Sequence, residues 1–260
     1  NLRLDNVNAA GTGAIVQSDG TSAVLINVGG TITNAMSLHN LRFQSNSVLA
    51  GVLTLNNANT VLEVTNGISG TISGALTGTG GLFKTNTGKL TLTGSNNYTG
   101  ATTVHSGILE VASGGSISSS ASTVNSGGTL NVYGNAGSID NSGTVSVAGT
   151  AGAITSTGST TIQSGGTSGA LTVNGGTTTV NGAAGLDRGG SRGGLKGSGT
   201  VGALEIASGG TLAVGNSPGS MTASSVTWDG GGKYAWEINN FLGSAGTNYD
   251  FLNVTGALTI

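Results

Sequence analysis

Short segments in which apolar and polar residues alternate run through most of this chain. Three of them carry apolar residues on alternate positions: Val24, Ile26 and Val28; Leu53 and Leu55; Leu90 and Leu92. Because successive side chains of a β-strand point to opposite faces, each segment predicts a short strand with one buried face. No window shows helical spacing, so we expect essentially no α-helix.

The strand-and-turn unit recurs at a nearly constant spacing between residues 128 and 182. GTLNVYGNAGSI ends at Ile139, GTVSVAGTAGAI ends at Ile154 and STTIQSGGTSGAL ends at Leu171, which are steps of 15 and 17 residues. A fixed period with unchanged chemistry indicates coils of chain stacked on one another. We therefore predict an all-β chain, a right-handed parallel β-helix built as a single-stranded solenoid, continuous over residues 1–260.

The composition supports this prediction and excludes two other Gly-rich classes. Gly contributes 50 of the 260 residues and Pro only one, without a Gly-X-Y register, which excludes collagen. Apolar residues make up 36% of the chain and fall on alternate positions, so a buried face is available and a disordered linker is disfavoured. Charged residues are only 7%, against roughly 25% in typical soluble domains. Thr, Ser and Asn should form most of the exterior.

Charge and cysteine content exclude several classes of partner. The formal net charge is −2 and the eight Lys and Arg residues are scattered, so no basic patch exists for nucleic acid. Cysteine is absent, which excludes disulfides and thiolate metal sites. No apolar run approaches the ~20 residues of a transmembrane segment. Both ends begin or finish in strand-like sequence, and we expect the chain to be a fragment of a longer secreted protein.

One stretch carries a family motif. Residues 80–111, GGLFKTNTGKLTLTGSNNYTGATTVHSGILEV, closely resemble the passenger-associated transport repeat, also called the autotransporter-associated β-strand repeat. The positions that match the family pattern are Gly81, Leu82, Lys84, Thr85, Gly88, Leu90, Leu92, Asn96, Tyr98, Thr99, Gly100, Thr103, Val104, Gly107 and Leu109.

A second stretch, residues 195–260, is similar to the segment that often follows these repeats in large secreted bacterial proteins. Val214 stands where that segment usually has Pro before the GNSPG turn. We expect residues 198–260 to form C-terminal coils. Together the two resemblances imply a parallel β-helix that is exported across the outer membrane or displayed on the cell surface. They imply no particular activity, since function in this family varies widely.

The densest cluster of charge lies in residues 185–197, GLDRGGSRGGLKG, and includes Arg188 and Arg192. Its many glycines predict a loop that projects from the coils. A functional interpretation makes the loop a contact for an acidic glycan or a processing site. The simpler interpretation, a solvated insertion, is favoured.

Aromatic residues concentrate near the end of the chain: Trp228, Tyr234, Trp236, Phe241, Tyr249 and Phe251. Alternation in KYAWEI puts Tyr234 and Trp236 on one face of a strand. Aromatic rings stack on sugars, so these two residues are candidate contacts for a glycan or a partner. Filling the core of a widened or capping coil is the favoured alternative.

No catalytic, cofactor-binding or metal-binding residue is predicted. GSGTVG at residues 197–202 satisfies G-x-G-x-x-G, but strand-like ALEIASGG follows it where a dinucleotide site needs a helix. The Gly-Asp repeat of calcium-binding β-rolls is absent from the sequence. The ten acidic residues are dispersed, whereas glycoside hydrolysis needs two carboxylates close together.

We therefore expect a non-catalytic segment of a bacterial protein located outside the cell or on the outer-membrane surface, acting as a stiff stalk, an adhesin or a filament building block. Its expected partners are further copies, through the terminal coils, and a surface glycan or another ligand on a host or neighbouring cell. The alternative is a β-helix that binds or degrades carbohydrate. Two acids and an Arg or Lys in one groove would favour the enzyme, and a smooth hydroxyl-bearing wall would disfavour it.

Overall fold

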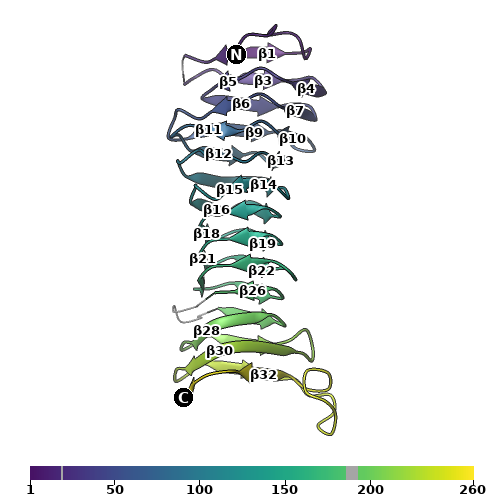
Figure 1. The fold of residues 1–260 in the computed structure, drawn as a ribbon, viewed down its shortest axis with the longest axis vertical. Helices are drawn as coiled ribbons and strands as arrows, with labels where there is room; N and C mark the ends of the chain where they lie inside the picture. Colours follow the sequence, from purple (N-terminus) through teal and green to yellow (C-terminus); the bar gives the residue numbers. More distant parts are fainter. Residues whose placement is uncertain (19, 186–192) are drawn as a thin grey trace. The chain divides into compact units, whose positions relative to one another are not determined.

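The computed structural model describes residues 1–18, 20–185 and 193–260. They form two compact units, Asn1–Ile139 and Asp140–Ile260. Both units are built from short strands joined by turns, and the described residues contain no α-helix (Figure 1). Nor do they contain a helix with the length and apolarity that a bilayer span requires. The prediction of an all-β parallel solenoid is confirmed, whereas one continuous body over both units stays a prediction.

In the first unit, parallel strands lie on three faces of each coil. The first face holds β1 (Leu2–Leu4), β3 (Val24–Ile26), β6 (Asn40–Phe43), β9 (Thr60–Val64), β12 (Leu82–Thr85) and the first parts of β14 (Thr102–Val111) and β16 (Ser122–Val132). The second face holds β4 (Gly30–Ile32), β7 (Ser47–Leu49), β10 (Ser69–Ile72), β13 (Lys89–Leu92) and the later parts of β14 and β16. The third holds β2 (Ile15–Val16), β5 (Met36–Ser37), β8 (Leu53–Thr54) and β11 (Leu76–Thr77), with β15 (Ser116–Ile117) pairing β17 (Asn135–Ala136).

The core of the first unit consists of apolar rows that stay in register from coil to coil. Ile26 of β3 lies opposite Phe43 of β6, which lies opposite Val64 of β9, and all three side chains are fully buried. Each buried aliphatic or aromatic side chain contributes about 1.5–3 kcal/mol. The alternating segments of the sequence are therefore the inward rows of the solenoid, as predicted.

The second unit repeats this arrangement. One face holds β19 (Thr144–Val147), β22 (Ser159–Ile162), β25 (Thr177–Val180), β27 (Gly194–Gly197), β29 (Thr211–Val214) and β31 (Lys233–Ala235). Another holds β21 (Ile154–Ser156) and β24 (Leu171–Val173). The third holds β20 (Thr150–Ala151), β23 (Thr167–Ser168), β26 (Ala183–Ala184), the first parts of β28 (Thr200–Ile206) and β30 (Ser220–Trp228), and β32 (Phe251–Val254), while β33 (Leu258–Thr259) pairs with the later part of β30. β18 (Ile139–Asn141) lies where the two units are divided.

The step of 17 residues read from the sequence is the length of one coil in the second unit. Ile154 pairs with Leu171 in the parallel ladder, and both side chains are buried. Thr144 pairs with Ser159, and Ser159 pairs with Thr177, so coils of different length keep the same register.

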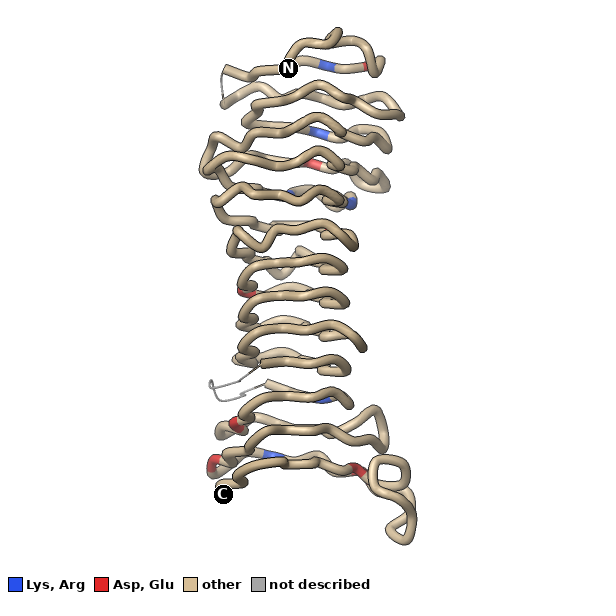
Figure 2. Tube along the Cα trace, viewed as in Figure 1, with Lys and Arg blue, Asp and Glu red and all other residues tan. Residues whose placement is uncertain are grey.

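Charged residues are sparse along both units (Figure 2). In the first unit, Arg42 forms an ion pair with Glu63, and Lys89 forms one with Glu110 at 3.3 Å, each pair joining neighbouring coils. Such partly exposed pairs contribute about 0–1 kcal/mol each. The buried rows, rather than these pairs, account for most of the stabilisation of the coils.

Candidate functional site

The lysine of the transport repeat is buried inside the fold. Lys84 lies on the inward side of β12 and has no solvent exposure. Its ammonium donates hydrogen bonds to the carbonyl oxygens of Thr85 at 3.0 Å, Asn86 at 2.8 Å and Ser106 at 3.2 Å. Burial lowers the pKa of Lys84 to about 8. The side chain thus fastens the turn after β12 to the middle of β14 in the next coil.

The tyrosine of the repeat is also a core residue. Tyr98 is 1% exposed, and its hydroxyl lies 2.5 Å from Oγ1 of Thr102. Thr102 in turn contacts Oγ of Ser120 at 2.8 Å, and Ser120 donates to the carbonyl oxygen of Gly100 at 2.8 Å. Burial raises the pKa of Tyr98 to about 12. These hydroxyls form a hydrogen-bonded chain across successive coils.

Gly107 of the repeat allows two coils to approach closely. Its φ is +71°, and a Cβ there would lie 2.3 Å from the carbonyl oxygen of Asn86. Only glycine fits such a position without displacing backbone. Lys84, Tyr98 and Gly107 of the repeat therefore join neighbouring coils.

The aromatic candidates of the sequence lie at the last coil of the second unit. Tyr234 in β31 pairs with the buried Leu212 of β29, so its side chain continues an inward row, although it is 38% exposed. Burial, together with the charge of Asp250, raises the pKa of Tyr234 to about 12. Trp236 is 52% exposed, and its Nε1 donates to the carbonyl oxygen of Asp250 at 2.8 Å. This placement favours the core-filling interpretation, and a glycan contact here stays a prediction.

The two arginine candidates, Arg188 and Arg192, lie outside the described residues. The expected corner at GSGTVG is present, because β27 ends at Gly197 and β28 begins at Thr200. The strand β28, rather than a helix, follows this corner.

A groove in the second unit brings together the residue types that an enzyme would need. It encloses about 360 Å³ and is lined by Lys196, Glu237 and Asp250, among others. Asp250 is only 4% exposed, however. Its Oδ1 accepts a hydrogen bond from the amide of Gly219 at 3.0 Å and its Oδ2 one from the amide of Glu237 at 2.9 Å. This carboxylate holds the chain between β31 and β32 in place, and each of its oxygens accepts a backbone hydrogen bond.

The described residues hold no group of three or more His, Cys, Asp and Glu side chains that is placed to bind a metal ion.

Two features of the first unit match no motif in the sequence. The ring of Phe83 stacks on the ring of His105, and a polar groove lies over β3, β6 and β9. The residues that form them are separated by about one coil length along the chain. A search for polar and aromatic residues at that spacing on the outer faces of strands would have found them.

Residues 82–111 match the Passenger-associated-transport-repeat family. The chain is also similar to the Adhesin BmaC autotransporter of Brucella suis biovar 1 (strain 1330), with 32% identity over 132 residues. That match covers 45% of this chain and 4% of the adhesin.

Among solved structures, the TibC-catalysed hyper-glycosylated TibA fragment covers 95% of this chain and is itself covered to 94%, with 20% identity and a TM-score of 0.32. The matched repeat and the similarity to the adhesin support an autotransporter passenger domain that carries this repeat, located outside the cell or on the outer-membrane surface.

Proposed function

We propose that this segment is a non-catalytic β-helical stalk within a surface adhesin. The observation that carries the proposal is the burial of the transport repeat. Lys84 and Tyr98 form hydrogen bonds that join the coils, and Gly107 allows the coils to approach closely. Because these three residues of the repeat serve the stacking of coils, the chain is suited to support and separate other parts of a protein.

The coil interfaces support a stiff element. Neighbouring strands are joined by parallel hydrogen-bonded ladders, and the side chains between them form apolar rows such as Ile26, Phe43 and Val64. In a repeat protein of this kind each coil is stabilised by its neighbours, so bending requires several contacts to break together.

A carbohydrate-degrading function is the second candidate, since Lys196, Glu237 and Asp250 line one groove. Glycoside hydrolysis needs two carboxylates that both reach the scissile bond. Asp250 is buried, and both of its oxygens accept backbone amides. A test for release of reducing ends from pectate and dextran should therefore detect no turnover. Turnover that Glu237→Gln abolishes would overturn the non-catalytic assignment.

The stalk role predicts that whole coils can be removed. Ser159 pairs with Thr177, so deletion of residues 159–176 joins Gly158 to Thr177 in the same register. We expect this variant to keep its β-sheet circular dichroism, to unfold cooperatively, and to be shorter by ~4.8 Å in small-angle scattering. Deletion of residues 159–167 is the control, because half a coil breaks the register and should unfold the second unit. Equal damage from the two deletions would contradict the proposal.

A further inference from the structure

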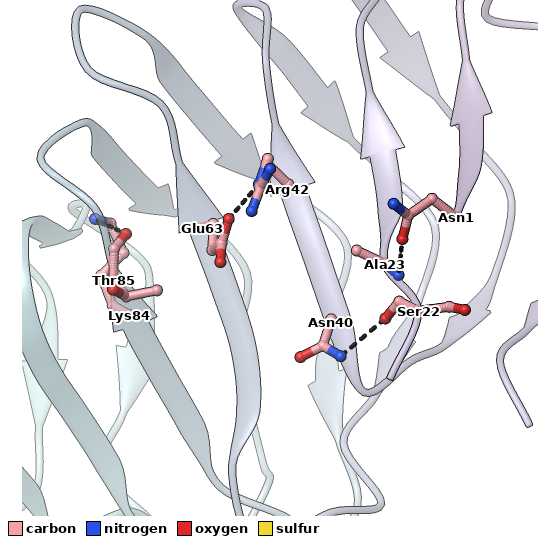
Figure 3. A network of polar contacts seen from close by, with 8 residues as sticks. All are labelled: Asn1, Ser22, Ala23, Asn40, Arg42, Glu63, Lys84 and Thr85. Atoms are coloured by element: carbon pink, nitrogen blue, oxygen red, sulfur yellow. Dashed lines mark hydrogen bonds and ion pairs between the residues drawn. The ribbon is translucent and has the colours of Figure 1, made fainter. Parts of the chain in front are cut away.

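The outer surface of the first unit carries a polar groove. It encloses about 330 Å³, and its lining includes Leu25 of β3, Asn40 and Arg42 of β6, and Glu63 of β9. Figure 3 shows Asn40, Arg42 and Glu63 on neighbouring strands. Leu41, which is next to Arg42 in sequence, and Leu62, which is next to Glu63, are buried. The groove side chains therefore belong to the outward rows.

The groove presents both donors and acceptors of hydrogen bonds. Nε of Arg42 is paired with Oε2 of Glu63, and the side chains of Arg42 and Glu63 are 41% and 24% exposed. Within the part of the chain that the structure describes, the rest of the guanidinium and Oε1 of Glu63 make no other hydrogen bond. Nδ2 of Asn40 donates to the carbonyl oxygens of Gly20 at 2.9 Å and Ser22 at 2.8 Å, which fixes the amide and leaves Oδ1 as an acceptor.

Two stacked aromatic rings, Phe83 and His105, which we call the platform, lie on the coils that follow this groove. Phe83 of β12 lies opposite Val61 of β9, two residues before Glu63, and its side chain is half-buried on the same outer face. The exposed ring of His105 in β14 stacks on it, with centroids 5.5 Å apart and planes inclined by 24°. The groove and the platform therefore occupy consecutive coils of one face.

The orientation of His105 is set by the following coil. The register between β14 and β16 shifts here, since Val104 pairs with Val124 and Ser106 pairs with Gly127. This bulge places Asn125 beside His105, with 3.1 Å between its Nδ2 and the imidazole Nδ1. An amide donor at Nδ1 assigns the imidazole proton to Nε2. Bulges of this kind re-aim side chains next to functional sites.

We propose that the groove and the Phe83–His105 platform form one binding site for a neutral glycan chain. Sugar hydroxyls both donate and accept hydrogen bonds. The groove offers Arg42 as a donor, and Glu63 and Asn40 as acceptors. The apolar face of a sugar ring stacks on an aromatic platform. Because Arg42 and Glu63 cancel in charge, the site favours a neutral saccharide over an acidic one. This inference rests on the adhesin role proposed above and names the ligand class and the site.

The experiment screens the full chain against immobilised cello-, malto-, manno- and galacto-oligosaccharides, with hyaluronan and heparin as acidic probes. Calorimetry then measures the dissociation constant of the strongest neutral binder. We expect Phe83→Ala to weaken it roughly tenfold or more and the double variant Arg42→Gln/Glu63→Gln to weaken it similarly. Phe83→Tyr retains the ring and should bind like the wild type.

Tyr133→Ala removes an exposed aromatic elsewhere in the first unit and is the matched control. It should bind like the wild type, and circular dichroism verifies that every variant is folded. No binding of any neutral probe up to about 1 mM would overturn the proposal. So would binding of the acidic probes alone, or loss of binding in Trp236→Ala but not in Phe83→Ala. None of these outcomes alters the expected result of the coil deletion, so the stalk role is tested separately.

Discussion

At the scale of the residue, the buried ammonium of Lys84 is the least expected feature. Lysine is almost never fully buried without compensation. Here its ammonium donates hydrogen bonds to three backbone carbonyl oxygens, and Figure 3 shows the bond to Thr85. The sequence identified Lys84 as a motif position two residues after Leu82, on the same side of the strand. It could not predict that the buried ammonium finds hydrogen-bond acceptors.

Titration of Lys84 gives a stability prediction. Its pKa is about 8 in the folded chain, lowered from 10.5. Between pH 8 and 10.5 the unfolded chain binds more protons at Lys84 than the folded chain does. The free energy of unfolding therefore increases with pH over this range, and Lys84 adds no such increase below pH 8. We expect the melting temperature of the wild type, relative to Lys84→Met, to rise from pH 8 to 10.

The exposed Lys233 provides the control. The melting temperature of Lys233→Met should change with pH in the same way as that of the wild type across this range. A constant difference between the wild type and Lys84→Met from pH 7 to 10 would show that the ammonium is not desolvated in the folded chain.

At the scale of the element, β14 and β16 each run across two faces of a coil, and Gly107 lies at the bend of β14. Gly107→Ala brings a Cβ within 2.3 Å of backbone, in addition to the strain of φ +71°. Gly114 has φ +83° but open space around its Cα. Gly114→Ala should therefore cost about 1 kcal/mol from strain alone, and Gly107→Ala clearly more, in chemical denaturation. Equal costs would mean that the coils can separate locally.

The strands themselves were largely predictable. Strict alternation at Leu53 and Leu55, or at Leu90 and Leu92, placed these residues inside, and all four are fully buried. The bulge opposite His105 was not predictable, because it depends on the register between two strands about 20 residues apart. The acceptors that surround Lys84 are backbone carbonyls of two coils, which no side-chain motif reveals.

At the scale of the whole molecule, the sequence predicted the solenoid and the surface location more readily than any site. The groove with Lys196, Glu237 and Asp250 was unforeseen, because Asp250 reaches it through the long excursion after β31. That excursion also exposes Phe241 and Leu242, at 76% and 82%.

These exposed side chains lead us to expect concentration-dependent self-association through the second unit. Large exposed apolar residues and unpaired strand edges favour contact with another chain. The double variant Phe241→Ser/Leu242→Ser should lower the average mass in light scattering at high concentration, whereas Tyr133→Ser in the first unit should not. A wild-type chain that remains monomeric at high concentration would contradict the expectation.

The unequal lengths of successive coils have an evolutionary consequence. The Thr144 and Ser159 positions are closer in sequence than Ser159 and Thr177, yet all three stay aligned because the corners absorb the difference. Insertions and deletions of codons at corners are therefore tolerated. The insertion or deletion of one codon within a strand would instead turn its apolar row toward water. Genes for such chains can lengthen by duplicating one coil, and neighbouring coils can then diverge independently in their corners.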